Sequence, residues 1–260
     1  MKKILGMGNA LTDILVCLDN DKHLENLNLP KGSMQLVDEV QNAKVQEYIH
    51  TMDKQMIAGG SASNTMRGIA CLGGNASFVG MVGNDAIAKV FETELKETGV
   101  NAKLFSSNVP SGTATTFISA DGERTFATHL GAAIGMTADM ITPEIFKGYD
   151  IFHIEGYLVQ NHDLIRKAIH IAKFHGLKIS LDLASYNVVE ENLEFLRSIV
   201  ADYVDILFAN EEEALAFTSK QPEEALDEIA EMCEYAIVKV GKKGSMIKHN
   251  DVITTEGITD

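Results

Sequence analysis

The second half of the chain alternates short apolar runs with stretches of helical periodicity. Short apolar runs are typical of buried strands, and the stretches between them are long enough for covering helices. Strands that alternate with such helices favour a doubly wound α/β fold, which is a mostly parallel sheet with helices on both faces. The predicted elements are strand 150–154, helix 162–175, strand 178–183, helix 189–200, strand 205–209, a helix that ends at Phe217, helix 222–233 and strand 235–240.

Several predicted strands of the first half fall outside this alternation. They are residues 14–18, residues 34–37 and the two arms of a hairpin, 113–119 and 124–128. The turn Ala120-Asp121-Gly122-Glu123 joins the two arms. Glycine and aspartate are common in hairpin turns, because they accept the backbone conformations that a tight turn requires. We expect these strands to form a small separate sheet.

The last part of the chain departs from the alternation. The turn Val240–Ser245 contains two glycines, but too few residues separate them for a Walker A loop. Strands are predicted at 245–248 and 251–255, and the sequence closes with Gly257-Ile258-Thr259-Asp260. We expect this hairpin to be unpaired and to lack a covering helix, which a doubly wound sheet normally has.

Composition narrows the class of ligand. Lys and Arg number 22 and Asp and Glu 37, so the net charge is −15, which opposes binding to nucleic acid or to an anionic membrane surface. A nucleotide ligand would need a divalent cation to screen it. Cys17, Cys71 and Cys233 show no metal-binding spacing, and we expect buried thiols in a cytoplasmic protein. No apolar run is long enough to span a bilayer.

The stretch Ala58–Thr65 places a glycine pair between an extended run and a helical pattern. Glycine lets the backbone approach a ligand closely, because it has no Cβ. Ser61 or Ser63 could cap the following helix and leave its first N–H groups for an oxygen-rich ligand. An ordinary strand-to-helix turn explains the same residues.

Polar residues follow the first predicted core strand, Lys3–Gly8. The pattern Gly6-Met7-Gly8 starts like a dinucleotide fingerprint, but the third glycine and the later acidic residue are missing, which argues against a nicotinamide cofactor. Asn9 and Asp13 place an amide and a carboxylate just beyond the strand's carboxyl end, where open α/β sheets bind ligands. A turn or helix cap is the alternative role for Asp13.

A second polar pair follows the strand at 205–209. Asn210 and Glu213 lie three residues apart, so they face the same way on the first turn of a helix. An amide and a carboxylate in this position suit a hydrated Mg²⁺ that carries phosphate. The alternative is a helix N-cap with acidic first-turn residues. His129, His153 and His162 are scattered, and we expect them to be surface or core residues and not metal ligands.

Four of these motifs together resemble the ribokinase, or PfkB, family of carbohydrate kinases. The glycine-rich stretch Ala58–Thr65 is one of them. The others are Gly-Met-Gly-Asn-Ala-Leu-Thr-Asp-Ile at 6–14, Tyr-Val-Asp-Ile-Leu-Phe-Ala-Asn-Glu-Glu-Glu-Ala at 203–214 and Val-Lys-Val-Gly-Lys-Lys-Gly at 238–244. Within the family, the chain is similar to the adenosine kinases. The resemblance runs from residue 3 to about residue 257, with the motifs in the family's order.

The resemblance implies a fold and a set of site residues. It implies a kinase domain made of residues 1–13, 51–110 and 130–260, and a β-sheet lid made of residues 14–50 and 111–129. In the sugar pocket, Asp13 would hold ribose hydroxyls, and Asn9, Gly59, Gly60 and Asn64 would complete the pocket. Tyr157 would lie against a purine, and Arg124 would reach from the lid toward the phosphate as the catalytic arginine. Asn210 and Glu213 would hold Mg²⁺ through water. Asn210, Gly241 and Gly244 would contact ATP.

The activity implied is Mg²⁺-dependent transfer of phosphate from ATP to the primary hydroxyl of a nucleoside or sugar. The family's Gly-Ala-Gly-Asp turn, which carries an anion hole and the catalytic base, should follow residue 257; Gly257–Asp260 does not match it, and Asp260 is not taken as the base. We therefore expect the C-terminal part of the fold to be missing and this chain to have little kinase activity. A plain-sugar kinase of the ribokinase or fructokinase type and a catalytically silent nucleoside-binding or sugar-binding protein are the alternatives. The chain is expected to be a monomer or a dimer formed through the lid.

Overall fold

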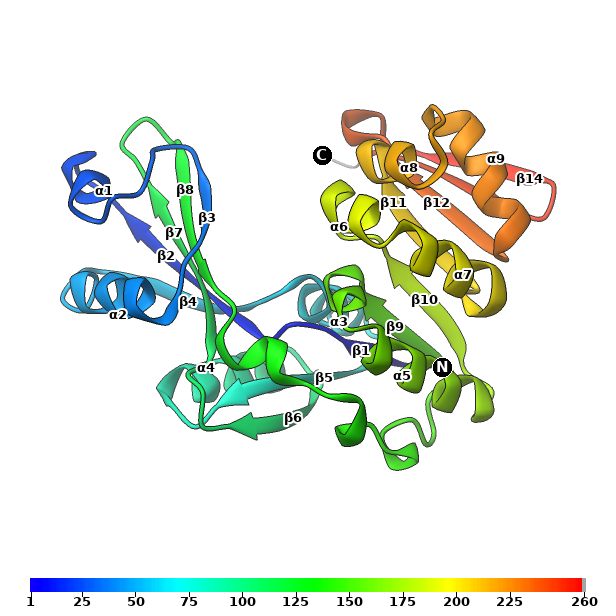
Figure 1. Ribbon diagram of the computed structural model, residues 1–260, viewed down its shortest axis with the longest axis horizontal. Coiled ribbons are helices and arrows are strands. Elements are labelled where there is room, and N and C mark those ends of the chain that lie inside the picture. The colour runs from blue at the N-terminus through cyan, green and yellow to red at the C-terminus, as the bar shows by residue number, and fades with distance from the viewer. Residues whose placement is uncertain (259–260) are drawn as a thin grey trace. The chain divides into compact units, whose positions relative to one another are not determined.

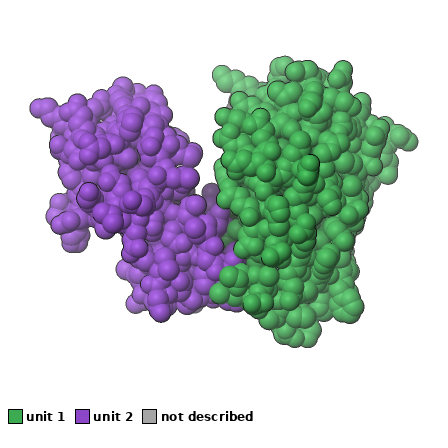
Figure 2. Space-filling model, viewed as in Figure 1, with its two compact units in different colours: residues 1–8, 74–77, 137–260 green, residues 9–73, 78–136 purple. Residues whose placement is uncertain are grey.

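The computed structural model describes residues 1–258, which divide into two compact units. Among these residues, unit 1 comprises Met1–Gly8, Gly74–Ser77 and residues 137–258, and unit 2 comprises Asn9–Gly73 and Phe78–Met136 (Figure 2). There are two sheets: a five-stranded sheet lies in unit 2, and a nine-stranded sheet has most of its strands in unit 1 and its strands β5 (Asn75–Gly83) and β6 (Asn101–Ser107) mainly in unit 2.

Unit 1 contains a sheet whose central strands are parallel, as the alternation predicted (Figure 1). β1 (Lys3–Met7), β9 (Ile151–Glu155), β10 (Lys178–Asp182), β11 (Ile206–Asn210) and β12 (Tyr235–Lys239) follow one another in parallel pairs. Successive residues of β9, β10 and β12 are buried, so both faces of these strands are covered. The doubly wound α/β prediction is confirmed.

The helices of unit 1 lie between these strands in sequence. They are the α-helices α5 (His162–Phe174), α6 (Tyr186–Glu191), α7 (Leu193–Tyr203), α8 (Glu211–Thr218) and α9 (Pro222–Met232), and the 3₁₀ helices η2 (Ala138–Met140), η3 (Pro143–Ile145), η4 (Gly156–Gln160) and η5 (Gly241–Lys243). The single helix predicted at 189–200 is wrong, because α6 and α7 are separated at Asn192. Asn192 leaves the helical conformation, and its amide donates to the Val188 carbonyl and accepts from His162, as asparagine side chains do at helix ends.

The C-terminal hairpin extends this sheet. β13 (Ser245–His249) pairs antiparallel with β12 over five residues, and β14 (Val252–Glu256) pairs antiparallel with β13. The expectation of an unpaired hairpin is therefore wrong, because the short turn at Gly241–Lys243 folds β13 back onto β12. Helix α9 contacts β13, whereas every residue of β14 is exposed.

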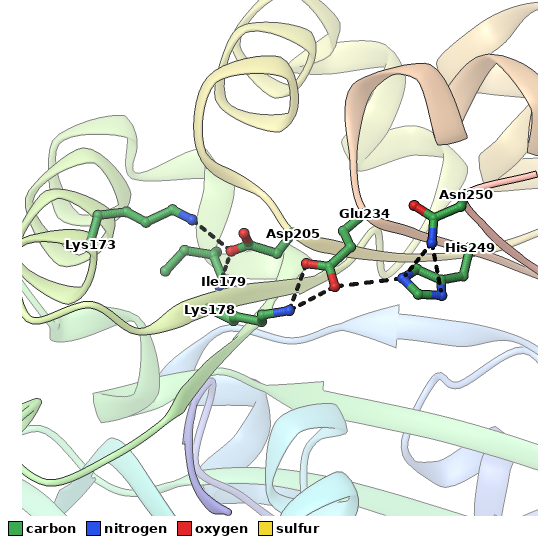
Figure 3. A network of polar contacts seen from close by, with 7 residues as sticks. All are labelled: Lys173, Lys178, Ile179, Asp205, Glu234, His249 and Asn250. Carbon is green, nitrogen blue, oxygen red and sulfur yellow. Dashed lines mark hydrogen bonds and ion pairs between the residues drawn. The ribbon is translucent and has the colours of Figure 1, made fainter.

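A network of charged residues ties together the starts of the strands β10 to β12 (Figure 3). The Asp205 carboxylate lies 2.6 Å from Lys173 Nζ and accepts from the Ile179 amide at the same distance. Lys178 and Glu234 form a second ion pair at 2.6 Å. These residues lie at the amino ends of the strands, so the carboxyl ends remain for the polar residues of the predicted site.

Unit 2 contains a five-stranded sheet in the order β3-β8-β7-β2-β4. The strands are β2 (Leu11–Cys17), β3 (Met34–Leu36), β4 (Gln55–Gly59), β7 (Gly112–Ile118) and β8 (Arg124–His129). The prediction of a small separate sheet is confirmed, and the structure adds β4, the extended run before the glycine pair. The other elements are α1 (Lys22–Asn26), α2 (Glu39–Tyr48), α3 (Ser61–Cys71), α4 (Ala86–Glu97), η1 (Gly131–Gly135), β6 (Asn101–Ser107) and β5 (Asn75–Gly83), which begins in unit 1.

An apolar cluster stabilises one part of this small sheet. Ile14 and Val16 of β2 and Phe117 of β7 are completely buried against Val45 and Ile49 of helix α2 and the residue after it. Side chains alternate along a strand, so Ile14 and Val16 face this core while Asp13 faces the other side. The core thereby fixes the direction of the Asp13 carboxylate.

The three cysteines differ in their surroundings. Cys17 at the end of β2 and Cys71 at the end of α3 are exposed, so the expectation that they are buried is wrong. Both stand at the last position of an element, where the packed face ends. Cys233 is buried as expected, and burial raises the pKa of its thiol to about 12. No helix within residues 1–258 is long and apolar enough to cross a bilayer.

Asp85 joins two segments of unit 2. Its carboxylate accepts from the Ala88 amide at 2.8 Å, which caps helix α4, and from the Ser111 amide and hydroxyl at 2.7 Å each. Burial alone would raise the pKa of Asp85, but the hydrogen bonds from Ser111 and Ala88 outweigh burial and hold this pKa below its ordinary value. The charged form of Asp85 therefore stabilises the folded state.

We predict that Asp85→Ala lowers the free energy of unfolding by about 2–3 kcal/mol, because it removes a helix cap together with two charge-assisted hydrogen bonds. Asp38→Ala is the matched control. Asp38 also caps a helix in unit 2, and its side chain accepts from the Gln41 amide at 2.7 Å, so this change should cost only about 1 kcal/mol. Urea unfolding of both variants measures the difference.

The pH dependence supplies a second check on Asp85. Because its folded-state pKa is lowered, its contribution to stability is complete above the unfolded pKa, near 3.8, and disappears as the pH falls through the folded value. The gap between wild type and Asp85→Asn should therefore narrow below about pH 4. Equal stabilities of Asp85→Ala and Asp38→Ala at pH 7 would contradict this role.

Candidate functional site

The glycine pair at the end of β4 has a backbone that other residues would not adopt readily. Gly60 has φ 85°, and a Cβ at this position would collide with the Asn9 carbonyl oxygen. Gly60 is also the N-cap of α3, and because glycine has no side chain, no side-chain group caps the first turn of this helix. The expectation that Ser61 or Ser63 caps this helix is wrong, because Ser61 is already its first helical residue and Ser63 is fully buried.

Gly59 leaves the space that the Asp13 carboxylate occupies. A Cβ on Gly59 would collide with both carboxylate oxygens of Asp13, so the two residues lie in direct contact across the β2–β4 pair. Asp13 is partly buried, and burial raises its pKa while the positive charge of Arg67 lowers it, with burial the larger effect. A carboxylate held this way can accept hydrogen bonds from vicinal hydroxyls.

Five residues that the sequence singled out lie close together in unit 2. Asp13 contacts Gly59, Gly60 lies against the Asn9 carbonyl, and the backbone N–H of Asn64 donates to the Gly60 carbonyl at 2.9 Å. Asn9 is 4% exposed, whereas Asn64 is exposed on α3. We call Asn9, Asp13, Gly59, Gly60 and Asn64 the hydroxyl-binding group, because amides and one carboxylate can pair with several hydroxyls at once.

The structure places Arg124 away from this group along the strands. Arg124 is exposed and pairs with Ile118 at one end of β7, whereas Asp13 pairs with Ala114, four positions earlier on that strand. Four strand residues correspond to about 13 Å. The role of Arg124 as the catalytic arginine stays a prediction.

Polar residues gather at the carboxyl ends of the parallel strands in unit 1. Glu155 ends β9, Asp182 ends β10, Asn210 ends β11 and Lys239 ends β12. The register places Asp182 beside Glu155 and Asn210 beside Lys239. Since the carboxyl ends of neighbouring parallel strands meet at one edge, these residues share the edge where open α/β sheets bind ligands.

Asn210 and Glu213 hold each other in a capping box. The Asn210 side chain accepts from the Glu213 amide at 2.8 Å, and the Glu213 carboxylate accepts from the Asn210 amide at 2.8 Å and from Nδ2 at 2.7 Å. The helix-cap alternative of the sequence analysis is thus confirmed as a structural role. Burial is the main reason that the pKa of Glu213, which is 2% exposed, is raised.

Tyr157 lies at the same end of unit 1. It belongs to η4 and is 43% exposed. Burial, and then the carboxylates of Glu155, Glu213 and Asp182, raise the pKa of the Tyr157 phenol, which therefore stays protonated. The preceding Gly156 is required by packing, because a Cβ there would collide with the Asp182 carbonyl.

The sequence analysis missed an ion pair at this edge. Lys239 Nζ lies 3.0 Å from Asp182 Oδ2, and the other Asp182 oxygen accepts from the Ala184 amide. Burial lowers the pKa of His153 on β9 to about 4, so its ring is neutral at pH 7, and His153 is a core residue. Polar residues at the carboxyl ends of strands were the signal for Asn210, and the same signal identifies Asp182 and Lys239.

Gly241 is the first residue of the 3₁₀ turn η5, and Gly244 directly follows its last residue. Gly241 has φ 55° and lies beside Glu211 of α8, whereas a Cβ on Gly244, with φ 94°, would collide with the Glu256 carbonyl. A cavity of about 280 Å³ next to this turn is lined by Glu211, Val240, Lys243 and Met246, among others. Within residues 1–258, no cluster of three or more His, Cys, Asp or Glu side chains could hold a metal ion by itself.

The chain is similar in sequence and in fold to several known proteins. The model of the pfkB family carbohydrate kinases matches residues 32–257. The guanosine-inosine kinase of Escherichia coli is 28% identical over 255 residues, which cover 93% of this chain and 58% of that protein. The adenosine kinase of Schizophyllum commune is 28% identical over 238 residues, covering 88% of this chain and 68% of that protein.

Among solved structures, the adenosine kinase of Sinorhizobium meliloti superposes with a TM-score of 0.84 at 28% identity, covering all of this chain and 80% of that one. The chain spans somewhat more than half the length of the guanosine-inosine kinase, so the activity of the whole protein is a separate question. The match over residues 32–257, together with the strand order and the glycine pair, means that this chain belongs to the pfkB family of carbohydrate kinases.

Proposed function

We propose that the protein is a nucleoside kinase that transfers phosphate from ATP to the primary hydroxyl of a purine nucleoside. The observation that carries this proposal is the contact between the partly buried Asp13 carboxylate and Gly59, which leaves both carboxylate oxygens beside a glycine-rich turn. Guanosine-inosine kinase and adenosine kinases among the relatives support a nucleoside as the substrate.

In this proposal the hydroxyl-binding group holds the ribose. Asp13 accepts hydrogen bonds from two vicinal hydroxyls, and Asn64 and Asn9 supply amide groups. The glycine pair lets the sugar approach the backbone at the start of α3. Tyr157 contributes an aromatic face for the purine, and Arg124 of the β7–β8 hairpin supplies positive charge to the transferred phosphate.

In this proposal, residues of unit 1 hold ATP and Mg²⁺. Both Glu213 oxygens accept from Asn210, and each carboxylate oxygen has a second lone pair that can accept from a metal-bound water. This fits a hydrated Mg²⁺ held mainly by phosphate, because Mg²⁺ usually keeps several waters in such sites. Gly241, Gly244 and the neighbouring cavity would contact ATP, and the metal would supply charge neutralisation on the phosphates.

A plain sugar is the second candidate substrate, because the hydroxyl-binding group recognises hydroxyls and does not itself require a base. A binding protein without turnover is the third. Calorimetric titration with adenosine, inosine, guanosine, ribose and fructose, followed by assay of phosphate transfer from ATP, separates the three. Phosphate transfer to a nucleoside supports our proposal, and phosphate transfer only to a sugar supports the second candidate. Binding of either ligand without turnover supports the third.

Asp13→Ala should weaken adenosine binding while the fold stays intact. Losing charge-assisted hydrogen bonds to two hydroxyls should cost about 2–4 kcal/mol, which is a loss of tens-fold to several-hundred-fold in affinity. Calorimetry measures the affinity, and circular dichroism confirms the fold. Unchanged affinity in the folded variant would assign Asp13 a purely structural role.

Gly59→Ala should weaken adenosine binding through Asp13, because the new methyl group would displace the carboxylate. We expect a loss of at least about 1–2 kcal/mol of binding free energy. Gly68→Ala is the matched control, since a Cβ at this helical position meets nothing within 4 Å. It should keep full affinity and stabilise the protein by about 0.5–1 kcal/mol. Similar affinities for the two variants would contradict the proposed contact between Asp13 and the ligand.

Tyr157→Ala distinguishes a purine nucleoside from a plain sugar. Loss of stacking should weaken adenosine by about 1–3 kcal/mol and leave free ribose almost unaffected. Tyr186→Ala is the control, because Tyr186 is also in unit 1 and is 44% exposed, close to the 43% of Tyr157. An equal loss for adenosine and ribose in Tyr157→Ala would favour the plain-sugar kinase.

A further inference from the structure

Arg67 connects three elements of unit 2 around the hydroxyl-binding group. Its Nη1 donates to the Ala58 carbonyl of β4 at 2.6 Å, and the same nitrogen lies 3.4 Å from Asn64 Oδ1 on α3. Its Nη2 lies 3.8 Å from Glu94 Oε2 on α4. Only 22% of the side chain is exposed, so the guanidinium is held in place by its partners.

The bond to Ala58 fixes the backbone directly before the glycine pair. β4 is the edge strand of the five-stranded sheet, and it pairs only with β2. An edge strand has fewer backbone partners than a central strand, so its end is easier to displace. The short Arg67–Ala58 hydrogen bond holds this strand end against α3, just where Gly59 and Gly60 must be placed.

The contact with Asn64 orients an amide. Because Oδ1 of Asn64 faces the guanidinium, its Nδ2 group points away from Arg67 and can donate to an oxygen of a ligand. An asparagine on the exposed side of a helix would otherwise sample several rotamers. Arg67 thereby favours one presentation of the Asn64 side chain.

The charge of Arg67 also acts on Asp13. Burial favours the neutral carboxyl of Asp13, and the Arg67 cation is the group that opposes this effect. Glu94, which faces Arg67 from α4, keeps the guanidinium paired on its other side. An ionised carboxylate accepts through both oxygens, whereas a protonated carboxyl has one oxygen that carries a proton and can donate. Arg67 thus contacts Asn64 and the backbone directly before the glycine pair, and its charge acts on Asp13.

We propose that Arg67 is the positioning residue of the hydroxyl-binding group: it fixes the backbone at Ala58, next to the Gly59 that lies against Asp13, and it orients Asn64, without itself touching the substrate. The part of this inference that concerns the ligand rests on the proposed function, whereas the effect on Asp13 can be measured in the unliganded protein. Nothing in the sequence pattern alone indicated Arg67, because its role depends on the packing of β4 and α4 against α3.

The first experiment follows the Asp13 carboxyl by NMR as the pH is changed, in the unliganded protein. Arg67→Met removes the charge and keeps much of the side-chain volume, and Arg67→Lys keeps the charge. We expect the titration midpoint of Asp13 to move to higher pH in Arg67→Met and to return toward the wild-type value in Arg67→Lys. Lys89→Met is the matched control, because it removes a cation from an exposed position on α4 and should leave the midpoint unchanged.

The second experiment measures adenosine affinity of the same variants by calorimetry. At pH 7.5, Arg67→Met should bind about 10- to 100-fold more weakly, and Arg67→Lys should recover only part of the loss, since the lysine ammonium is a compact charge on a flexible stem and lacks the rigid planar donor arrangement of a guanidinium. Affinity should fall with decreasing pH as Asp13 becomes protonated, and the fall should begin at a higher pH in Arg67→Met. A mere loss of stability would not shift this pH profile.

Each outcome has a definite meaning. An unchanged Asp13 midpoint in folded Arg67→Met, or an affinity loss of equal size in Lys89→Met, would overturn the proposal. If Arg67→Met does not fold, Arg67→Lys and Glu94→Gln give the answer: both should fold, and adenosine affinity equal to wild type in both would overturn it. If the wild type binds no nucleoside or sugar, the proposed function is wrong, and the Asp13 midpoint alone then decides whether Arg67 controls the carboxylate.

Discussion

Parallel pairing of β9, β10, β11 and β12 is the constraint on which unit 1 depends. Parallel neighbours direct all their carboxyl ends to one edge, so the last residue of each strand meets the last residues of its neighbours. Glu155, Asp182, Asn210 and Lys239 all occupy such last positions. The opposite edge carries the ion pairs of Lys173 and Lys178, so the two edges have separate roles. One edge carries ion pairs that join the strands, and the other carries the polar residues of the candidate site.

Partly buried carboxylates recur in the two candidate groups, and each has a specific partner. Asp13 is opposed by the charge of Arg67, Glu213 is held by the two nitrogens of Asn210, and Asp182 is paired with Lys239. Removing a carboxylate from water is costly unless a charge or a hydrogen bond replaces the water. These partners therefore do more than add stability, because they also determine where each carboxylate points.

The alternation of apolar runs and helical stretches predicted most of the fold, because each signal is local. The parallel strands and the small separate sheet followed from residues that are close in sequence. The grouping of Asn9, Asp13, Gly59, Gly60 and Asn64 came from the resemblance to the family. Local sequence signals did not predict the exposed position of Cys17, the break at Asn192 or the pairing of β13 with β12, because these depend on which face is packed and on hydrogen bonds to distant residues. For the same reason they did not indicate Arg67, since its partners include residues of β4 and α4.

Asn210 and Glu213 illustrate why a structural role and a functional role should not be treated as exclusive. Their capping box satisfies the first turn of α8, and this alone explains why both residues are present. The same hydrogen bonds fix both side chains at the carboxyl end of β11, where a hydrated cation would need them already oriented. Removing either residue would change helix stability and site geometry together, so loss of activity in such a variant says little about metal binding. Asp13 is more informative, because within residues 1–258 its side chain caps no helix. It lies against Gly59, a residue whose substitution tests the same geometry from the other side.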